Sequence, residues 1–144
     1  MAGDTLRDAF RAELAAVVAA ASPAITWSIK DTVNKVENPD ASAGFIELEF
    51  AGGDEQQFTF GAPGANLHRE HAPVFIHVVT PLGESRDTAE TYAGQLRTAF
   101  RMRRFSAGSR SVRITATAPM GGGEIEGGMW CETVALIYEV FNIA

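Results

Sequence analysis

The chain has 144 residues, of which 46% are hydrophobic and 21% charged, with a formal net charge of −6. This balance excludes a disordered chain, fits one domain over residues 1–144, and argues against a chain that binds nucleic acid over its whole surface. A single cysteine, Cys131, excludes an internal disulfide, and without a membrane span or a signal-peptide pattern we expect a soluble cytoplasmic protein.

The first half of the chain predicts one helix followed by three strands. Residues 4–21 place apolar side chains at helical spacing, and Ser22-Pro23 ends that helix because proline disfavours helical backbone before it. Alternation of apolar and polar residues predicts strands at residues 25–29, 46–50 and 57–60. Residues 31–44 are predicted to form a loop. Residues 51–54 are predicted to be the turn of a hairpin between the second and third strands.

The second half predicts four further elements joined by loops. Residues 61–73 are rich in glycine, proline and charge and are predicted to be a loop before a central strand at Val74 to Val79. The second helix is expected at residues 88–101, with Asp87 and Glu90 as a capping box.

Two more strands are expected at residues 112–118 and 130–141, joined by a flexible glycine-rich connection at residues 119–128. The order α-β-β-β-β-α-β-β predicts an α+β two-layer sandwich. In this fold a mostly antiparallel sheet of about five or six strands carries two packed helices.

The candidate chemical motifs are weak. The junction between strand and helix near Gly83 has one glycine and no lysine, so a phosphate loop is not expected. His68 and His71 flank Glu70 without a metal-binding helical spacing, and a polar loop is the preferred interpretation.

Cys131 follows Trp130 and precedes Glu132, an acid that would disfavour the thiolate. A small buried side chain is therefore preferred over a nucleophile. His77 lies within an apolar strand and is expected to be a hydrogen-bonded core or sheet-face histidine. We expect no catalytic residue, no metal and no cofactor.

Charge is the stronger signal. One stretch without any acid contains Arg97, Arg101, Arg103, Arg104, Arg110 and Arg113. An earlier stretch is rich in acids, namely Asp31, Glu37, Asp40, Glu47, Glu49, Asp54 and Glu55. These are either two solvated faces or two halves of a contact in which the basic surface of one subunit meets the acidic surface of the next. Binding of DNA phosphate by the arginines is a third option, which the net acidity disfavours.

The glycine-rich connection adds a second interaction candidate. Ile125 lies between Glu124 and Glu126 among glycines. This tip is either a plain hairpin end or a loop that becomes ordered against a partner.

The pattern of elements resembles the tail terminator proteins of long-tailed phages and gene transfer agents. The resemblance rests on "LRDAFRAELAAVVAAA", "PVFIHVVTPLG", "RDTAETYAGQLRTAFRMRRF", "SVRITATAP" and "WCETVALIYEVF", which together span nearly the whole chain. It implies a structural virion protein, not an enzyme. Such a protein forms a hexameric ring that caps the tail tube, ends tube polymerisation and provides the joining surface for the neck.

The resemblance also implies the partners and the place. These are other copies of the chain, the tail tube protein and a neck or head-completion protein, in the neck region of a virion tail assembled in the host cytoplasm. DNA would pass through the channel without specific binding, and no membrane is involved. The interface is expected to include Arg97, Arg101, Arg103, Arg104, Arg110, Glu47, Glu49, Asp54, Glu124, Ile125 and Glu126.

Two alternatives remain open at the level of sequence. One is another head–tail joining or tail-tube protein of similar fold. The other is a small-ligand-binding or enzymatic α+β domain. Formation of a ring would separate the two structural hypotheses from the small-ligand-binding or enzymatic domain. A position at the top of the tail would separate a tail terminator from another joining or tail-tube protein.

Overall fold

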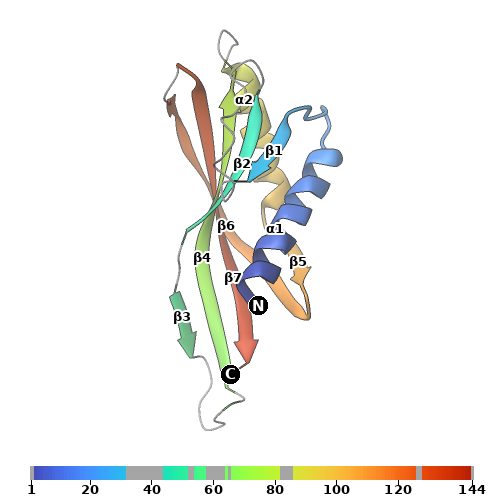
Figure 1. Ribbon diagram of the computed structural model, residues 1–144, viewed down its shortest axis with the longest axis vertical. Helices are drawn as coiled ribbons and strands as arrows, with labels where there is room; N and C mark the ends of the chain where they lie inside the picture. Colours follow the sequence, from blue (N-terminus) through green and yellow to red (C-terminus); the bar gives the residue numbers. More distant parts are fainter. Residues whose placement is uncertain are drawn as a thin grey trace.

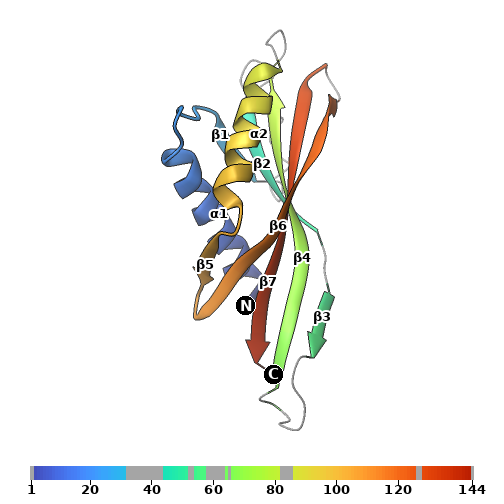
Figure 2. The same ribbon diagram turned by 180° about the vertical axis from the view of Figure 1, so that it is seen from behind.

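The computed structural model describes residues 2–31, 44–51, 54–57, 64, 66–81, 86–125 and 128–143. Helices α1 (Ala2–Ala19) and α2 (Asp87–Phe100) lie on the same side of one curled sheet (Figures 1 and 2). Both helices pack on the sheet through apolar stripes, with a polar or small-residue face left outward. The predicted two-layer α+β class is confirmed.

The sheet has seven strands in the order β1-β2-β4-β7-β6-β5, and β3 pairs separately with β4. The strands are β1 (Ser28–Asp31), β2 (Phe45–Phe50), β3 (Asp54–Gln57), β4 (Leu67–Thr80), β5 (Arg104–Ala107), β6 (Arg110–Glu124) and β7 (Trp130–Ile143). Every pair is antiparallel except β1 with β2. The long strands β4 and β7 pair along their full lengths and form the centre of the sheet.

The core lies between the helices and one face of the sheet. The predicted stripe of α1 is buried there through Leu6, Phe10, Leu14 and Val17. The Phe10 ring makes edge contacts with three other aromatic rings, whose centroids lie 4.9–5.6 Å away: Phe50, Phe105 and Tyr138. On α2, Leu96 and Phe100 are fully buried, as the helical periodicity predicts.

The predicted hairpin between the second and third strands is wrong. Both β2 and β3 pair with β4, β2 along its second half and β3 along its first half. Asp54, which was placed in a turn, begins β3. The chain therefore continues along one edge of β4 instead of folding back on β2. Residues 58–60 lie outside the described part of the chain.

The predicted loop at residues 61–73 is wrong from Leu67 onward, because β4 begins there. His68, Arg69, Glu70 and His71 pair with β3 on one side and β7 on the other. Backbone pairing on both sides holds this polar segment extended, although nothing in its side-chain pattern indicates a strand.

The glycine-rich connection is also shorter than predicted. Residues 119–124 belong to β6, and this segment pairs with β7 on both sides of a register shift between Pro119 and Gly122. Strand β5 was not predicted at all, and β1 begins three residues after Ile25. The capping box is wrong as well: Arg86 occupies the N-cap position without a side-chain cap bond, and Asp87 is the first residue of α2.

Candidate functional site

The sheet face that points away from the helices carries a hollow of about 700 Å³. Alternation along β2 produces it, since Ile46 and Leu48 are buried in the core while Glu47 and Glu49 point to the opposite face. We call it the sheet hollow. It is lined by Phe45, Glu47, Glu49, Phe75, His77, Val79, Met120, Gly121, Gly122, Gly123, Glu124, Ile125, Met129, Cys131 and Thr133.

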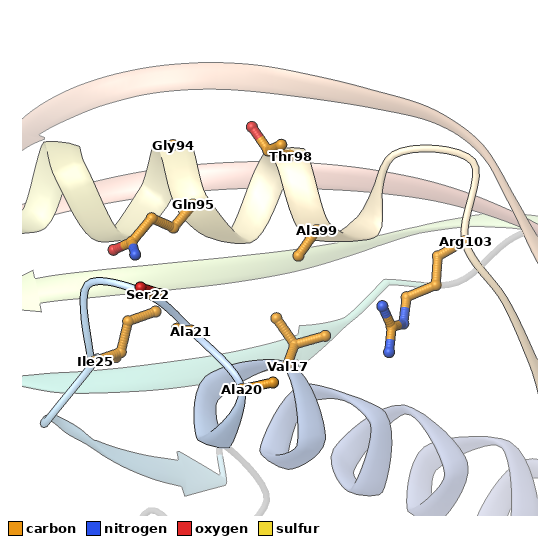
Figure 3. A pocket seen from close by; sticks show the side chains of 10 residues that line it. All are labelled: Val17, Ala20, Ala21, Ser22, Ile25, Gly94, Gln95, Thr98, Ala99 and Arg103. Atoms are coloured by element: carbon orange, nitrogen blue, oxygen red, sulfur yellow. The ribbon is translucent and has the colours of Figure 1, made fainter.

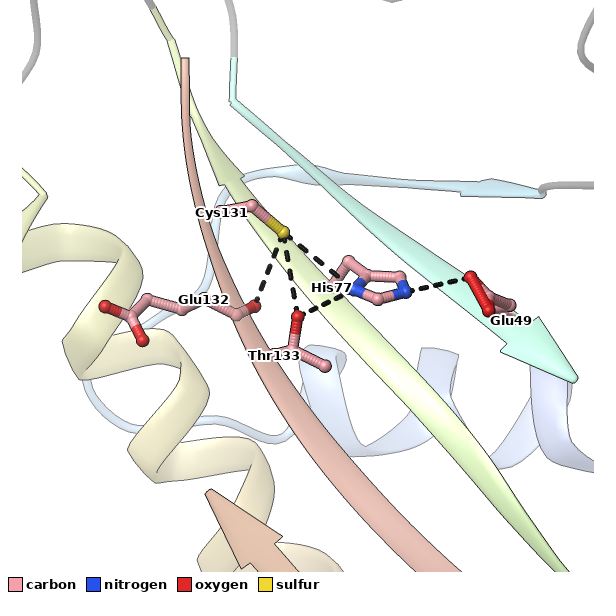
Figure 4. Close-up of polar contacts among 5 residues, drawn as sticks. All are labelled: Glu49, His77, Cys131, Glu132 and Thr133. Atoms are coloured by element: carbon pink, nitrogen blue, oxygen red, sulfur yellow. Dashed lines mark hydrogen bonds and ion pairs between the residues drawn. The ribbon is translucent and has the colours of Figure 1, made fainter. Parts of the chain in front are cut away.

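A hydrogen-bonded row crosses the floor of the sheet hollow (Figure 4). His77 on β4 lies directly opposite Glu47 on β2 and Thr133 on β7. Its Nδ1 lies 2.8 Å from Thr133 Oγ1, and its Nε2 lies 3.1 Å from Glu49 Oε2. The row thus joins side chains of three neighbouring strands. Its two ends, Glu49 and Thr133, are 84 positions apart in the sequence. The interpretation of His77 as a hydrogen-bonded sheet-face histidine is confirmed.

The surroundings of His77 favour its protonated form. The contact with the Cys131 thiol and the hydrogen bond to the Glu49 carboxylate raise the pKa of His77 above its usual 6.5, although its burial acts in the opposite direction. In the protonated ring both nitrogens donate, one to Glu49 and one to Thr133. The floor therefore gains a positive charge among carboxylates when the pH falls.

Cys131 lies at the edge of this row but lacks the geometry of a nucleophile. Its Sγ is 3.8 Å from His77 Nδ1, outside the reach expected of a base, and Thr133 already occupies that nitrogen at 2.8 Å. Gly123 pairs directly opposite Cys131, and its missing side chain leaves the half-buried thiol open to the sheet hollow.

The neighbouring acid Glu132 forms a hydrogen bond that was not predicted from the sequence. Its carboxylate accepts a hydrogen bond from Trp130 Nε1 at 2.9 Å. Successive side chains of a strand point to opposite faces, so this carboxylate lies on the helix side, away from the Cys131 thiol. The Glu132 carboxylate is thus engaged by the Trp130 indole.

The rim of the sheet hollow is apolar and exposed. Met120 on β6 is 59% exposed and Ile125, just beyond that strand, is 39% exposed. The exposed Glu124 lies beside them. Sequence reasoning named Glu47, Glu49, Glu124 and Ile125 as interface candidates, and the fold brings all four to this one hollow. His77, Thr133 and Met120 were not among the interface candidates, because only strand register places them beside these residues.

Two remaining acidic candidates cannot be placed in the same way. Asp54 begins β3, but its side chain lies outside the described part. Glu126 lies outside the described residues altogether.

The predicted arginine stretch does not form one uniform surface. Arg103 pairs with Glu13 of α1, and Arg113 lies 3.1 Å from Glu139. Arg97 and Arg110 are partly buried. The exposed cations of this stretch that have no acidic partner within the described residues are Arg101 and Arg104. They flank the turn from α2 into β5.

His68 and His71 do not converge. They are three positions apart on β4, so they point to opposite faces of the sheet. Within the described ranges, no group of three histidine, cysteine or acidic side chains is placed to hold a metal ion. Among the helices in the described part of the chain, none has the length and apolar character needed to cross a bilayer.

A second hollow of about 590 Å³ lies between the end of α1 and α2 (Figure 3). Its walls are mostly small side chains, including Ala20, Gly94 and Ala99. Gln95 Nε2 donates to Pro23 O at 2.7 Å and ties α2 to the chain that follows α1. This hollow contains no acid among its described lining residues and no titratable cluster.

The fold and the two hollows define a class: a two-layer α+β protein with surfaces suited to packing and no assembled catalytic group among the described residues. The family model for phage tail terminator protein matches residues 5–138. The chain belongs to the phage tail terminator family. It is accordingly a structural protein of a phage tail, in a family that is not known for enzymatic activity.

One solved structure is similar over 97% of this chain and 96% of its own, with a TM-score of 0.62. At 21% identity this likeness supports the fold alone. No curated protein matches the chain.

Proposed function

We propose that this protein is the terminator of a phage or phage-like tail. Copies of the chain form a hexameric ring on the finished tail tube, stop its polymerisation and present a joining surface to the neck. The single observation that carries the proposal is the family match, which extends over residues 5–138.

The distribution of charge supports a contact between copies. Exposed Arg101 and Arg104 lie at the end of α2, whereas Glu47, Glu49 and Glu124 gather at the sheet hollow. Opposite charges on distinct surfaces of one chain favour a head-to-tail contact, which closes into a ring when the rotation permits. The tail tube protein and a neck or head-completion protein would bind the two faces of that ring.

The net charge of −6 suits a channel through which DNA passes. An acidic wall repels phosphate and so prevents the DNA from binding while it moves. No cofactor is part of this proposal. The acidic channel wall is proposed from the net charge, and the location in the neck region is proposed from the family match.

The test is to remove the protein from the particle. Particles assembled without it should carry overlong tubes or tails that remain unattached to heads, and supplying the chain in trans should restore both length and joining. Tagged protein should lie at the head-proximal end of the tail in electron micrographs.

Tails of normal length joined to heads in the absence of the chain would contradict the proposal. A tag found along the whole tube would instead indicate a tube protein. A tag at the neck, with tube length unchanged by removal, would indicate another head–tail joining protein.

A further inference from the structure

Exposed apolar side chains occur at two places in the described part of the chain. The large hydrophobic side chains that are exposed there are Met102, Met120 and Ile125. Met120 and Ile125 belong to the rim of the sheet hollow. Met102 lies apart from them, in the turn from α2 into β5, and is 76% exposed. Met120 and Ile125 together give the sheet hollow an apolar rim, whereas Met102 is a single exposed apolar side chain.

The turn that carries Met102 is held in a fixed shape. We call residues Arg101–Arg104 the arginine turn. Arg103 N donates to Phe100 O at 3.1 Å, Ile114 N donates to Arg103 O at 2.9 Å, and the Arg103 side chain pairs with Glu13. These contacts hold Met102 at φ 59, a left-handed conformation that is unfavourable for a residue with a side chain. The result is a rigid projection with an apolar tip between two exposed arginines.

The sheet hollow has the complementary chemistry. Glu47 and Glu124 offer carboxylates, and Met120 and Ile125 offer apolar surface at the rim. Methionine side chains are flexible and polarisable, so they fit closely around an inserted methionine. An arginine turn that enters the hollow would place its two cations near acids and its apolar tip among apolar groups.

The two surfaces cannot meet within one molecule. The arginine turn follows α2, which covers one face of the sheet (Figure 2). The sheet hollow lies on the face of the sheet that points away from the helices. Each molecule therefore offers its projection on one side and its hollow on the other. This arrangement gives a head-to-tail contact that repeats around a ring.

We infer that the arginine turn of one subunit inserts into the sheet hollow of the next. This contact rests on the proposed function, since it is the ring contact of the terminator. The contact consists of Arg101, Met102 and Arg104 on one copy and of Glu47, Glu124, Met120 and Ile125 on the other. Arg103 is excluded from the contact because its side chain already pairs with Glu13.

Cysteine cross-linking tests the contact in assembled tails. A chain with Met102→Cys and Ile125→Cys should, on mild oxidation, yield a ladder of covalent oligomers that ends at the ring size. All these variants carry Cys131→Ser, because the Cys131 thiol opens into the same sheet hollow. The matched controls are the two single variants in that background, which should give no ladder. A two-fold contact through the turn would give dimers with Met102→Cys alone and would overturn the head-to-tail arrangement.

Charge exchange tests the same contact independently. Arg101→Glu with Arg104→Glu should fold normally by circular dichroism and lower ring formation by about tenfold or more, because like charges then face each other. Adding Glu47→Lys and Glu124→Lys to the same chain should restore much of the loss. Unchanged ring formation in the Arg101→Glu/Arg104→Glu variant would overturn the inference.

The outcomes separate this contact from the proposed function. If particles that lack the chain have normal joined tails, the proposed function fails. If removal gives overlong or unjoined tails while the cysteine pair gives no ladder in tails of normal length, only the contact fails.

Discussion

His77 connects three strands through one side chain, and its position makes the sheet face sensitive to pH. The ring bonds Thr133 on β7 and Glu49 on β2, with the Cys131 thiol beside it and Glu47 directly opposite. These groups are the charged and titratable neighbours that face it from the adjoining strands. Because Cys131 and Glu49 raise the pKa of His77, the folded chain holds the proton more tightly than the unfolded chain does.

This difference predicts a pH-dependent stability. A group whose pKa rises on folding contributes stability that is fully present below its unfolded value of about 6.5 and is lost as the pH rises through the folded value. His77→Gln should therefore lower the urea midpoint more at pH about 5.5 than at pH about 9. His71→Gln, at an exposed position of the same strand, is the control. An equal loss for His77→Gln at both pH values would contradict the argument.

Phe10 joins the helix layer to three strands through aromatic contacts. It is 1% exposed and touches aromatic rings from β2, β5 and β7. Truncation of a buried Phe to Ala costs about 3–5 kcal/mol, and Phe10→Ala should fall in that range. Phe75→Ala, on the more open face of the sheet, should cost less in the same thermal and denaturant unfolding measurements. Equal losses would show that Phe10 is not the organising contact.

At the scale of elements, the contact between the strand layer and α2 depends on a close approach at Gly44. A Cβ on Gly44 would lie 2.2 Å from two atoms of the Trp27 ring, which itself packs edge-on against Tyr92 of α2. Gly44→Ala should therefore displace the indole and cost about 1–3 kcal/mol, as overpacking does. A shift in Trp fluorescence should accompany the loss.

Gly94 on α2 provides the opposite case and the matched control. A Cβ there meets no atom within 4 Å. Gly94→Ala should raise the stability by about 0.5–1 kcal/mol, because Ala loses less backbone entropy in a helix than Gly does. If both alanine variants changed stability in the same direction, the packing at Gly44 would not be the cause of its effect.

The elements that could be predicted are those whose own side chains face the core. The periodic stripes of α1 and α2 and the alternation of β2 and β7 follow from burial on one face. The segments at residues 67–73 and 119–124 could not be predicted in this way. They are extended because β7 and β3 supply backbone partners, and such pairing leaves no mark in the side-chain pattern.

The sheet hollow was predictable only in part, for the same reason. Alternation assigns each of Glu47, Glu49 and His77 to a face of its own strand. Which of them become neighbours depends on the register between β2, β4 and β7, which is fixed by contacts distant in sequence. Which arginines are paired with acids could not be predicted either, because the ion pair of Arg103 with Glu13 joins residues 90 positions apart.

At the scale of the whole molecule, the proposed ring contact joins charges of opposite sign that lie on different faces of the chain. Arg101 and Arg104 are exposed at the end of the helix layer, and the acids of the sheet hollow lie on the opposite face of the sheet. In the proposed contact, this arrangement would favour one relative orientation of two copies during their encounter.

This separation predicts how ring assembly depends on salt. Attraction between exposed charges acts over about 10 Å at 0.1 M salt but only about 3 Å at 1 M. The rate at which purified chain assembles on tubes should therefore fall steeply between these two conditions. This rate can be followed by light scattering or by electron microscopy of samples taken over time.

Completed rings should dissociate at a rate that changes less with salt, because Met102, Met120 and Ile125 contribute an apolar part that salt does not screen. The Arg101→Glu/Arg104→Glu variant is the control and should lose the dependence or reverse it. An assembly rate of the unaltered chain that is the same at both salt concentrations would mean that the arginine turn and the sheet hollow do not face each other during encounter.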